Sequence, residues 1–236
     1  MIEWEEAGII VGRRRLPRGA LVLAHTPRRG LVRGMVYGIR DVARCSTWLT
    51  GNLVAIQWTS RSQGGLGTLT GTTLASPATD LHGSQPERLM ALGAAASLVG
   101  GLADGHPQPR LHAGLLEYAL RDVFGPLWLL HYLRFELGFI SEAGFAPPHR
   151  LLAAAAKAGR FDERIVPDKI SCETRIPDAD LLPSLRWLGT WLGRHLPARG
   201  PQALPVMRRS LEELCARRAR GDDRWDGSVT AEKRAA

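Results

Sequence analysis

The first third of the chain carries short apolar runs that are separated by turn residues. The runs are GIIVGRRR at Gly8–Arg15, ALVLAHT at Ala20–Thr26, and three more at Leu31–Ile39, Asn52–Ser60 and Leu66–Ala75. Each run has the length and the β-branched or aliphatic content of a strand, with glycine and proline between the runs. Five short strands of this kind are typical of a small β-barrel of the OB type, so we expect that barrel here.

The pattern changes between Pro77 and Pro86, where an apolar period of two gives way to a period near 3.6. Apolar residues recur at helical spacing most clearly in Leu127–Gly144. The other expected helices cover residues 88–102, 111–124, 181–195 and 204–219, whereas residues 145–180 are poorly patterned apart from a short alanine-rich piece at Leu151–Lys157. The expected fold is therefore α+β, with the strands at the N-terminal end and the helices after them.

Three segments follow from these patterns. We expect an OB-type nucleic-acid-binding barrel over residues 1–78 and a helical domain over residues 86–220. Residues 221–236 are polar and charged with no apolar period, which predicts a disordered tail.

The charge of the chain indicates the kind of partner that it binds. The chain has 31 Lys and Arg against 23 Asp and Glu, a net charge of +8, which favours a polyanionic partner. Much of the excess lies in the predicted barrel, where only Asp41 opposes the arginines between residues 13 and 44. These arginines are Arg13, Arg14, Arg15, Arg18, Arg28, Arg29, Arg33, Arg40 and Arg44. We predict that they converge on one side of the barrel and bind DNA through its phosphates; the alternative is a solvated basic surface.

Three aromatic residues lie near these arginines in sequence. Tyr37, Trp48 and Trp58 offer flat surfaces on which bases can stack. The competing interpretation places Trp58 and Tyr37 in the barrel core, and for Trp58 we prefer the core.

No pattern indicates an enzyme. The seven histidines are scattered and form no HExxH motif, and His149 and Cys172 match no familiar metal spacing. The glycines at 64–67 lack the features of a phosphate-binding loop, and the three cysteines form no CxxC pair. We therefore expect no catalytic residue, no metal and no cofactor. The acidic start of the chain differs from a signal peptide and its apolar stretches are short, so we expect a cytoplasmic protein without a membrane partner.

Several motifs, taken in their order along the chain, resemble those of one bacterial family. They are MIEWEEAGIIVG at Met1–Gly12, LVRG at Leu31–Gly34, GN at Gly51–Asn52, LRFELGFISEAGF at Leu133–Phe145 and LGRHL at Leu192–Leu196. Each motif alone is weakly specific, but together they resemble the RecO family of DNA repair proteins, particularly its alphaproteobacterial members.

The resemblance implies an N-terminal OB barrel, a helical C-terminal domain and a non-enzymatic recombination mediator. It implies binding of single- and double-stranded DNA, annealing of complementary strands, and association with the nucleoid. It also implies cooperation with RecR to load RecA on DNA coated by the single-stranded-DNA-binding protein SSB. The acidic SSB tail needs a basic group beside apolar residues on helices. For this site we expect Arg121 and Arg134, near Trp128, Leu130 and Phe135.

The chain departs from the family pattern in one chemical respect. Many members carry cysteines after the LGF helix, some in a zinc site, whereas residues 146–171 here contain none. The resemblance therefore implies no zinc in this chain. Two other functions stay open at this stage: an OB-fold RNA-binding protein, and a divergent hydrolase or nuclease that uses the scattered histidines and acids.

Overall fold

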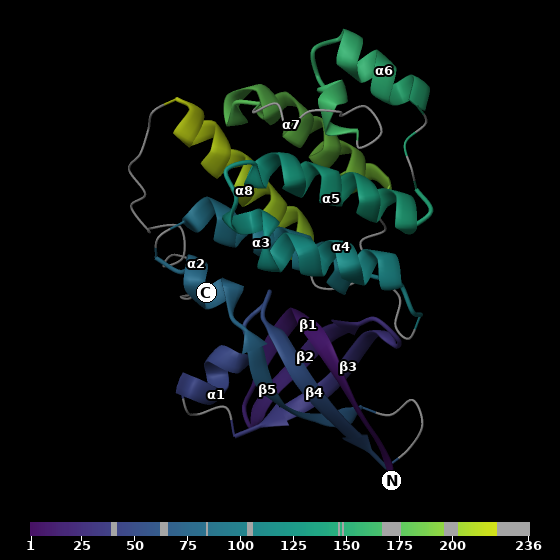
Figure 1. Ribbon diagram of the computed structural model, residues 1–236, viewed down its shortest axis with the longest axis vertical. Coiled ribbons are helices and arrows are strands. Elements are labelled where there is room, and N and C mark those ends of the chain that lie inside the picture. The colour runs from purple at the N-terminus through teal and green to yellow at the C-terminus, as the bar shows by residue number, and fades with distance from the viewer. Residues whose placement is uncertain are drawn as a thin grey trace.

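The computed structural model divides the chain into a barrel and a set of helices that lie above it (Figure 1). The described residues are 1–38, 42–61, 66–83, 85–102, 106–145, 147, 149–166, 176–195 and 203–220, with the backbone alone for 42–44, 178 and 203–206. The barrel is built from the first 75 residues, and the helices above it begin at Pro77.

Five strands form the barrel. They are β1 (Ile2–Leu16), β2 (Gly19–Thr26), β3 (Gly30–Tyr37), β4 (Leu53–Ser60) and β5 (Gly67–Ala75). The strands close in the order β1-β2-β3-β5-β4, and all pairs are antiparallel except a short parallel pairing of β3 with β5. The first half of β1 pairs with β4 and the second half with β2, so this strand belongs to two sides of the barrel. An irregularity between Ile10 and Gly12 lies where β1 changes partner and bends the strand.

The barrel has its own core because side chains along a strand point alternately to its two sides. On β2, Ala20, Val22 and Ala24 are buried together with the inward residues of the other strands. The intervening residues of β2, including Leu21 and Leu23, point outward. This alternation decides below which arginines share a face.

The helices follow a simple order. They are α1 (Val42–Thr47), between β3 and β4, and then α2 (Pro77–Leu81), α3 (Pro86–Gly100), α4 (Pro109–Leu120), α5 (Trp128–Glu142), α6 (His149–Lys157), α7 (Asp178–His195) and α8 (Ala203–Ala219). Short 3-10 turns, η1 (Asp122–Phe124) and η2 (Glu163–Ile165), follow α4 and α6. A proline opens α2, α3 and α4, where its missing N–H has no hydrogen bond to lose. None of the helices in the described ranges is long and apolar enough to span a bilayer.

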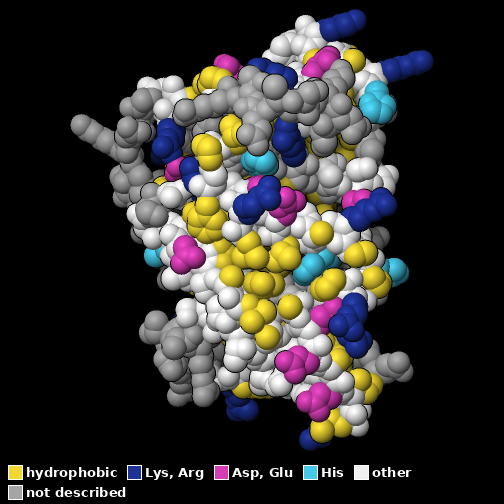
Figure 2. Space-filling model, viewed as in Figure 1, with side chains coloured by type: hydrophobic (Ala, Val, Ile, Leu, Met, Phe, Trp, Pro, Cys, Tyr) yellow, Lys and Arg dark blue, Asp and Glu magenta, His cyan; other side chains and the backbone are white. Residues whose placement is uncertain are grey.

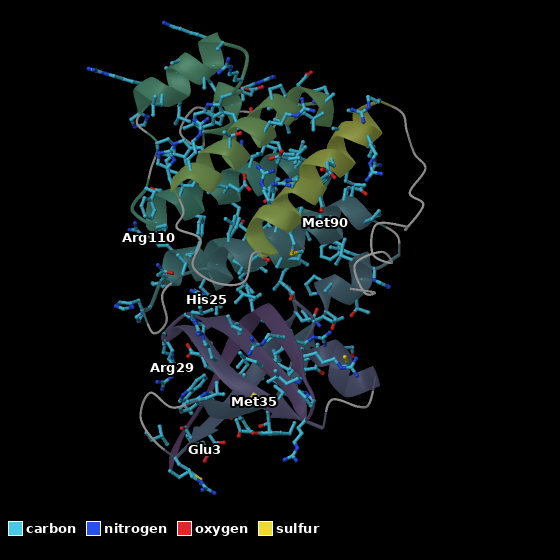
Figure 3. All side chains as sticks on the ribbon, turned by 180° about the vertical axis from the view of Figure 1, so that it is seen from behind. Glu3, His25, Arg29, Met35, Met90 and Arg110 are labelled. Carbon is cyan, nitrogen blue, oxygen red and sulfur yellow. The ribbon has the colours of Figure 1, made fainter. Side chains whose placement is uncertain are left out.

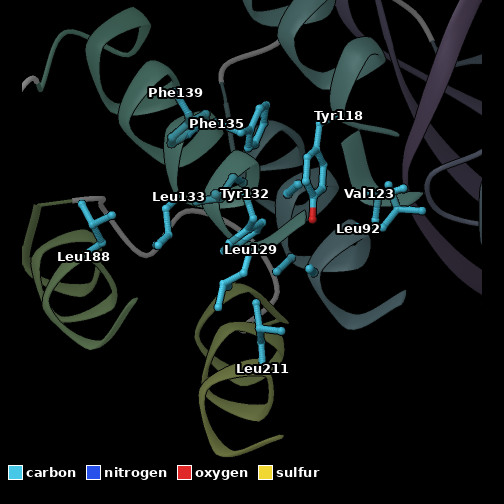
Figure 4. Packing of buried hydrophobic residues seen from close by; sticks show 14 of the residues in the cluster. Leu92, Tyr118, Val123, Leu129, Tyr132, Leu133, Phe135, Phe139, Leu188 and Leu211 are labelled. Carbon is cyan, nitrogen blue, oxygen red and sulfur yellow. The ribbon is translucent and has the colours of Figure 1, made fainter. Parts of the chain in front are cut away.

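Helix α5 lies at the centre of the helical core. In Figure 4 its Leu129 and Leu133 face Leu211 of α8 and Leu188 of α7, and all four side chains are fully buried. The same buried cluster takes in Ile9, Val11 and Leu31 from the outside of the barrel. The helices and the helical end of the barrel are thus packed as one continuous core.

A close backbone contact also joins the two parts. Gly30, at the start of β3, has φ of 64° and lies against His106 in the connection before α4. A β-carbon on Gly30 would lie 2.0 Å from the carbonyl oxygen of His106, so the contact requires glycine.

A buried ion pair crosses the helical core. Arg208 of α8 donates from Nη2 to Oε2 of Glu136 on α5 at 2.9 Å and to the carbonyl of Leu185 at 2.6 Å. Tyr132 donates to the same carboxylate at 2.6 Å, and Glu212 accepts from Nη1 of Arg208 at 2.9 Å. Burial alone would lower the pKa of Arg208, but the adjacent Glu136 carboxylate raises it above its ordinary value. The guanidinium is therefore charged in the core, and each of its three nitrogens donates at least one hydrogen bond to Glu136, Glu212 or Leu185.

The α+β prediction and the five strands are confirmed. Three features were missed: β1 begins at Ile2, well before Gly8, the short helix α1 follows β3, and the short helix α2 follows β5. The expected helix over 111–124 is also wrong in its extent, since α4 covers Pro109–Leu120 and a 3-10 turn follows. The boundaries of the two domains stay a prediction, and the expected disordered tail lies outside the described residues.

Candidate nucleic-acid interface

The register of β1 separates its three consecutive arginines. Arg13 and Arg15 pair with Val22 and Ala20, which point into the barrel, so these two arginines lie on the inward side of the sheet. Arg13 uses this position to donate to the carbonyl oxygen of Cys45 on α1 at 3.0 Å. Arg14 pairs with the outward Leu21 and lies on the opposite side of the same sheet.

The outward side of β2 and β3 brings a second arginine beside Arg14. Arg33 pairs with Leu23, and Met35 pairs with Leu21. With the outward Tyr37 at the end of β3, these residues form what we call the basic outer face: Arg14, Leu21, Leu23, Arg33, Met35 and Tyr37. Its arginines are exposed, and its aliphatic residues are half-buried.

The helices cover only one end of this side of the barrel. His25 and Leu31, the next outward residues toward the helices, are buried. Figure 3 shows His25 at the helical end of the barrel and Met35 toward the opposite end. Leu23, at the helical edge of the basic outer face, packs against the helical core, and the rest of the face extends away from the helices.

Arg18 and the pair Arg28 and Arg29 lie at opposite ends of β2. Arg18 is exposed in the turn between β1 and β2, whereas Arg28 and Arg29 lie in the turn between β2 and β3. An eight-residue strand separates the two turns by on the order of 25 Å. Arg18 thus borders the basic outer face at its open end, and the other two lie at the helical end.

Arg28 and Arg29 have a local acidic partner. The carboxylate of Glu6 lies 3.6 Å from Nε of Arg28 and 4.0 Å from Nε of Arg29, and it accepts a hydrogen bond from the Arg28 amide at 3.0 Å. The guanidinium of Arg29 also lies 4.7 Å above the ring of Trp4. These two arginines therefore hold the β2–β3 turn against β1.

The nine arginines do not all converge on one side of the barrel, so this expectation is wrong. Alternation along β1 and the length of β2 divide the seven that are described into separate groups. Arg40 lies outside the described residues, and the side chain of Arg44 on α1 does as well. DNA binding by Arg13, Arg15, Arg28 and Arg29 stays a prediction without the shared face that motivated it. Arg14, Arg18 and Arg33 lie on or beside the basic outer face, and DNA binding by them also stays a prediction.

A different side of the barrel is acidic. Glu3 and Glu5, on the first half of β1, pair with Thr59 and Gln57 of β4 and are exposed. Gln57 donates to Glu5 at 3.4 Å. Figure 2 shows acidic side chains on the lower part of the barrel in this view. The barrel thus carries opposite charges on different sides, and a polyanion is attracted to the basic outer face.

The three aromatic candidates separate by burial. Trp58 is 9% exposed in the barrel core and donates from Nε1 to the carbonyl of Arg33 at 3.1 Å, which confirms the core interpretation for this residue. Trp48 is buried as well, at 3% exposure. Tyr37 is 57% exposed on the basic outer face.

The residues predicted for the SSB-tail site differ in exposure, and the site itself stays a prediction. Arg121 is exposed but forms ion pairs with Glu117 at 3.2 Å and Asp122 at 3.4 Å. Arg134 lies half-buried on α5. Its predicted apolar neighbours Trp128, Leu130 and Phe135 are buried in the helical core, so they offer no open groove. The apolar residues exposed near Arg121 are Leu120 and Phe124.

Sequence reasoning missed a pair of histidines where the barrel meets the helices. His25 of β2 and His112 of α4 stack with ring centroids 5.4 Å apart, and their Nδ1 atoms are 3.2 Å apart. Burial, followed by the neighbouring His112, lowers the pKa of His25 to about 4. Burial also lowers the pKa of His112, although the nearby Glu6 opposes that shift. Both rings are therefore neutral at physiological pH. The two residues are 87 positions apart, so no motif spacing reveals them.

This pair predicts that acid destabilises the protein. The unfolded chain binds protons on these histidines below pH ~6.5, whereas the folded protein does not until the pH approaches the lowered pKa. Stability should therefore fall as pH drops from 6.5 toward 4, by roughly 3 kcal/mol for His25 at about 1.4 kcal/mol per pH unit. Urea unfolding measured across this range checks the prediction. His25→Gln should flatten the curve between pH 6.5 and 4, and an unchanged slope in that variant would contradict the assignment.

Within the described residues, no cluster of three or more His, Cys, Asp or Glu is arranged to hold a metal ion. Cys172 lies outside those residues. On the basic outer face, exposed arginines lie among half-buried aliphatic residues, and guanidinium groups are able to bind phosphates.

Comparison with known proteins finds DNA repair proteins called RecO as relatives of this chain. No protein-family model matches the chain. It is 31% identical over 147 residues to the DNA repair protein RecO of Hyphomonas neptunium, a match that covers 61% of this chain and 60% of that protein. RecO of Anaplasma marginale is 27% identical over 83% of this chain and 92% of the relative, and RecO of a Ruegeria species is 27% identical over 92% and 100%. The chain thus spans less than two thirds of the Hyphomonas protein in its match. The resemblance that the motifs indicated is confirmed.

Proposed function

Because this chain is a relative of the RecO DNA repair proteins, we propose that it binds DNA without catalysing a reaction and acts in recombinational repair. In this proposal the protein binds single- and double-stranded DNA and anneals complementary strands on the cytoplasmic nucleoid. It works with RecR to help load RecA on single-stranded DNA that SSB coats.

The observation that carries the proposal is the basic outer face on β1, β2 and β3. The strand order β1-β2-β3-β5-β4 with parallel β3 and β5 supports an OB-type barrel. OB barrels bind oligonucleotides on the face of strands 2 and 3 and on the loops that border it. Arg33 lies on that face, Arg14 lies next to it on β1 opposite Leu21 of β2, and Arg18 lies in the bordering β1–β2 loop.

The chemistry of the face fits a mediator that does not read sequence. Guanidinium groups bind phosphates, which are the same in every sequence, and the aliphatic residues between them contact bases without hydrogen-bond readout. Neutralising phosphates also reduces the repulsion between two complementary strands, which is what annealing requires.

Salt dependence of single-stranded DNA binding tests the proposed function. We expect the logarithm of the binding constant to fall linearly with the logarithm of salt concentration, with a slope near −2 if three arginines each contact one phosphate. Fluorescence anisotropy with an oligothymidylate over a salt series measures this slope. No binding at low salt, or binding that salt leaves unchanged, would refute the proposal. Stronger binding to RNA than to DNA of the same length would favour an OB-fold RNA-binding protein instead.

The second part of the proposal is a binding site for the SSB tail on the helical part. We propose that Arg121 binds an acidic group of the tail, with Leu120 and Phe124 as the apolar neighbours that Trp128 and Leu130 cannot supply. Arg134 stays the second candidate. Co-purification of SSB and RecR with the tagged protein, and loss of SSB alone from an Arg121→Glu variant, are the expected results. Equal recovery of SSB by that variant would remove Arg121 from the site.

A further inference from the structure

We propose that the ring of Tyr37 is a stacking platform for an unpaired base of single-stranded nucleic acid. The inference rests on the proposed function, because it names the part of the basic outer face that distinguishes a single strand from other polyanions. It concerns one side chain at the end of β3 and its surroundings.

Exposure singles out Tyr37 among the aromatic residues of the barrel. Its side chain is 57% exposed, whereas Trp48 and Trp58 are 3% and 9% exposed inside the barrel. Trp4 is only partly exposed and lies between other groups, since its ring stacks on Trp58 and the guanidinium of Arg29 lies over it. Tyr37 therefore offers the open aromatic surface that stacking requires.

The backbone explains why this ring stays open. Tyr37 pairs with Gly19, and the strands approach so closely there that a β-carbon on Gly19 would lie 2.1 Å from the carbonyl oxygen of Val36. The position beside Tyr37 on β2 must therefore be glycine, so β2 places no side chain against the ring. Gly19 in turn pairs with Leu16 of β1, so on this side of β3 the nearest outward side chain in the row lies two strands away.

Charge complementarity identifies the occupant. Arg14 lies on β1 about 10 Å across the sheet from β3, two strand spacings away, and Arg18 lies in the turn directly before Gly19. Leu21 of β2 and Met35 of β3, which lie across the sheet from Arg14, are apolar. An open aromatic ring bordered by guanidinium groups and aliphatic side chains matches a base with a phosphate on either side.

The test separates the base from the phosphate. Binding of an oligothymidylate and of an abasic oligonucleotide of the same length is measured for the wild type, Tyr37→Ala and Tyr37→Phe. We expect Tyr37→Ala to bind the oligothymidylate roughly fivefold to a hundredfold more weakly, with the abasic affinity and the salt slope unchanged. Tyr37→Phe, which keeps the ring, should bind both ligands like the wild type.

A matched control and the contrary outcomes complete the design. Phe145→Ala removes a 42%-exposed ring from the helical part and should change neither affinity. Equal affinities of Tyr37→Ala and the wild type for oligothymidylate would overturn the inference while leaving the proposed function standing. An equal loss on both ligands would also overturn it, because the ring would then serve a protein contact or the fold. Absence of any salt-dependent binding by the wild type would instead refute the proposed function.

Discussion

Replacing Arg208 by alanine should lower the free energy of unfolding by about 3–5 kcal/mol, the largest effect on stability that the structure predicts. The substitution leaves the fully buried Glu136 carboxylate charged and without its partner in the helical core. It also leaves the carbonyl of Leu185 without its donor. Urea or thermal unfolding followed by circular dichroism measures the change.

Two further variants separate the ion pair from a general effect of lost arginine. Arg209→Ala removes an exposed guanidinium next in sequence and should change stability by about 0.5 kcal/mol or less. The double variant Glu136→Leu with Arg208→Met removes both charges and should be more stable than Arg208→Ala alone. A loss below about 1 kcal/mol in Arg208→Ala would show that the pair does not stabilise the core in this way.

Reversing Arg14, Arg18 and Arg33 to glutamate should weaken binding of single-stranded DNA roughly a hundredfold at low salt. The three side chains lie on or beside one open face, so their reversal places negative charge where the phosphates are proposed to bind. The salt slope of the remaining binding should approach zero. Anisotropy titrations of the triple variant against the wild type measure both quantities.

The control for this variant must change the net charge equally. Arg150, Arg160 and Arg209 are exposed on the helical part, and reversing them to glutamate also lowers the net charge by six. This second triple variant should keep most of the affinity, because charges beyond the Debye length of ~8–10 Å are largely screened. Equal losses in the two triple variants would mean that net charge, and not the basic outer face, determines binding.

The positions of the strands and helices could be predicted from the sequence better than the side of each strand on which a given residue lies. Strands β2 to β5 and the long helix around Leu133 were visible because their apolar periods are regular. The first half of β1 was missed because Glu3 and Glu5 make it look like a polar segment. In the structure those glutamates are the outward residues that alternate with the inward Trp4 and Glu6.

The sequence predicted that the candidate site contains arginines, but not which of them lie together in space. A cluster of arginines is visible in the sequence, but the side on which each one lies depends on register, and the bulge near Ile10 shifts that register by one residue. Pairs far apart in the chain were likewise invisible. His25 meets His112, and Glu136 meets Arg208, only because the barrel and the helices pack together.

Photo-crosslinking of an oligonucleotide that carries 5-iodouracil tests the central claim most directly, because it reports which residues the bases contact in the unmodified protein. We predict crosslinked peptides from β3 and the β1–β2 hairpin, with Tyr37 and Met35 among the modified residues. Crosslinks that fall only on the helices, or only on the acidic side around Glu3 and Glu5, would contradict the assignment of DNA binding to the basic outer face.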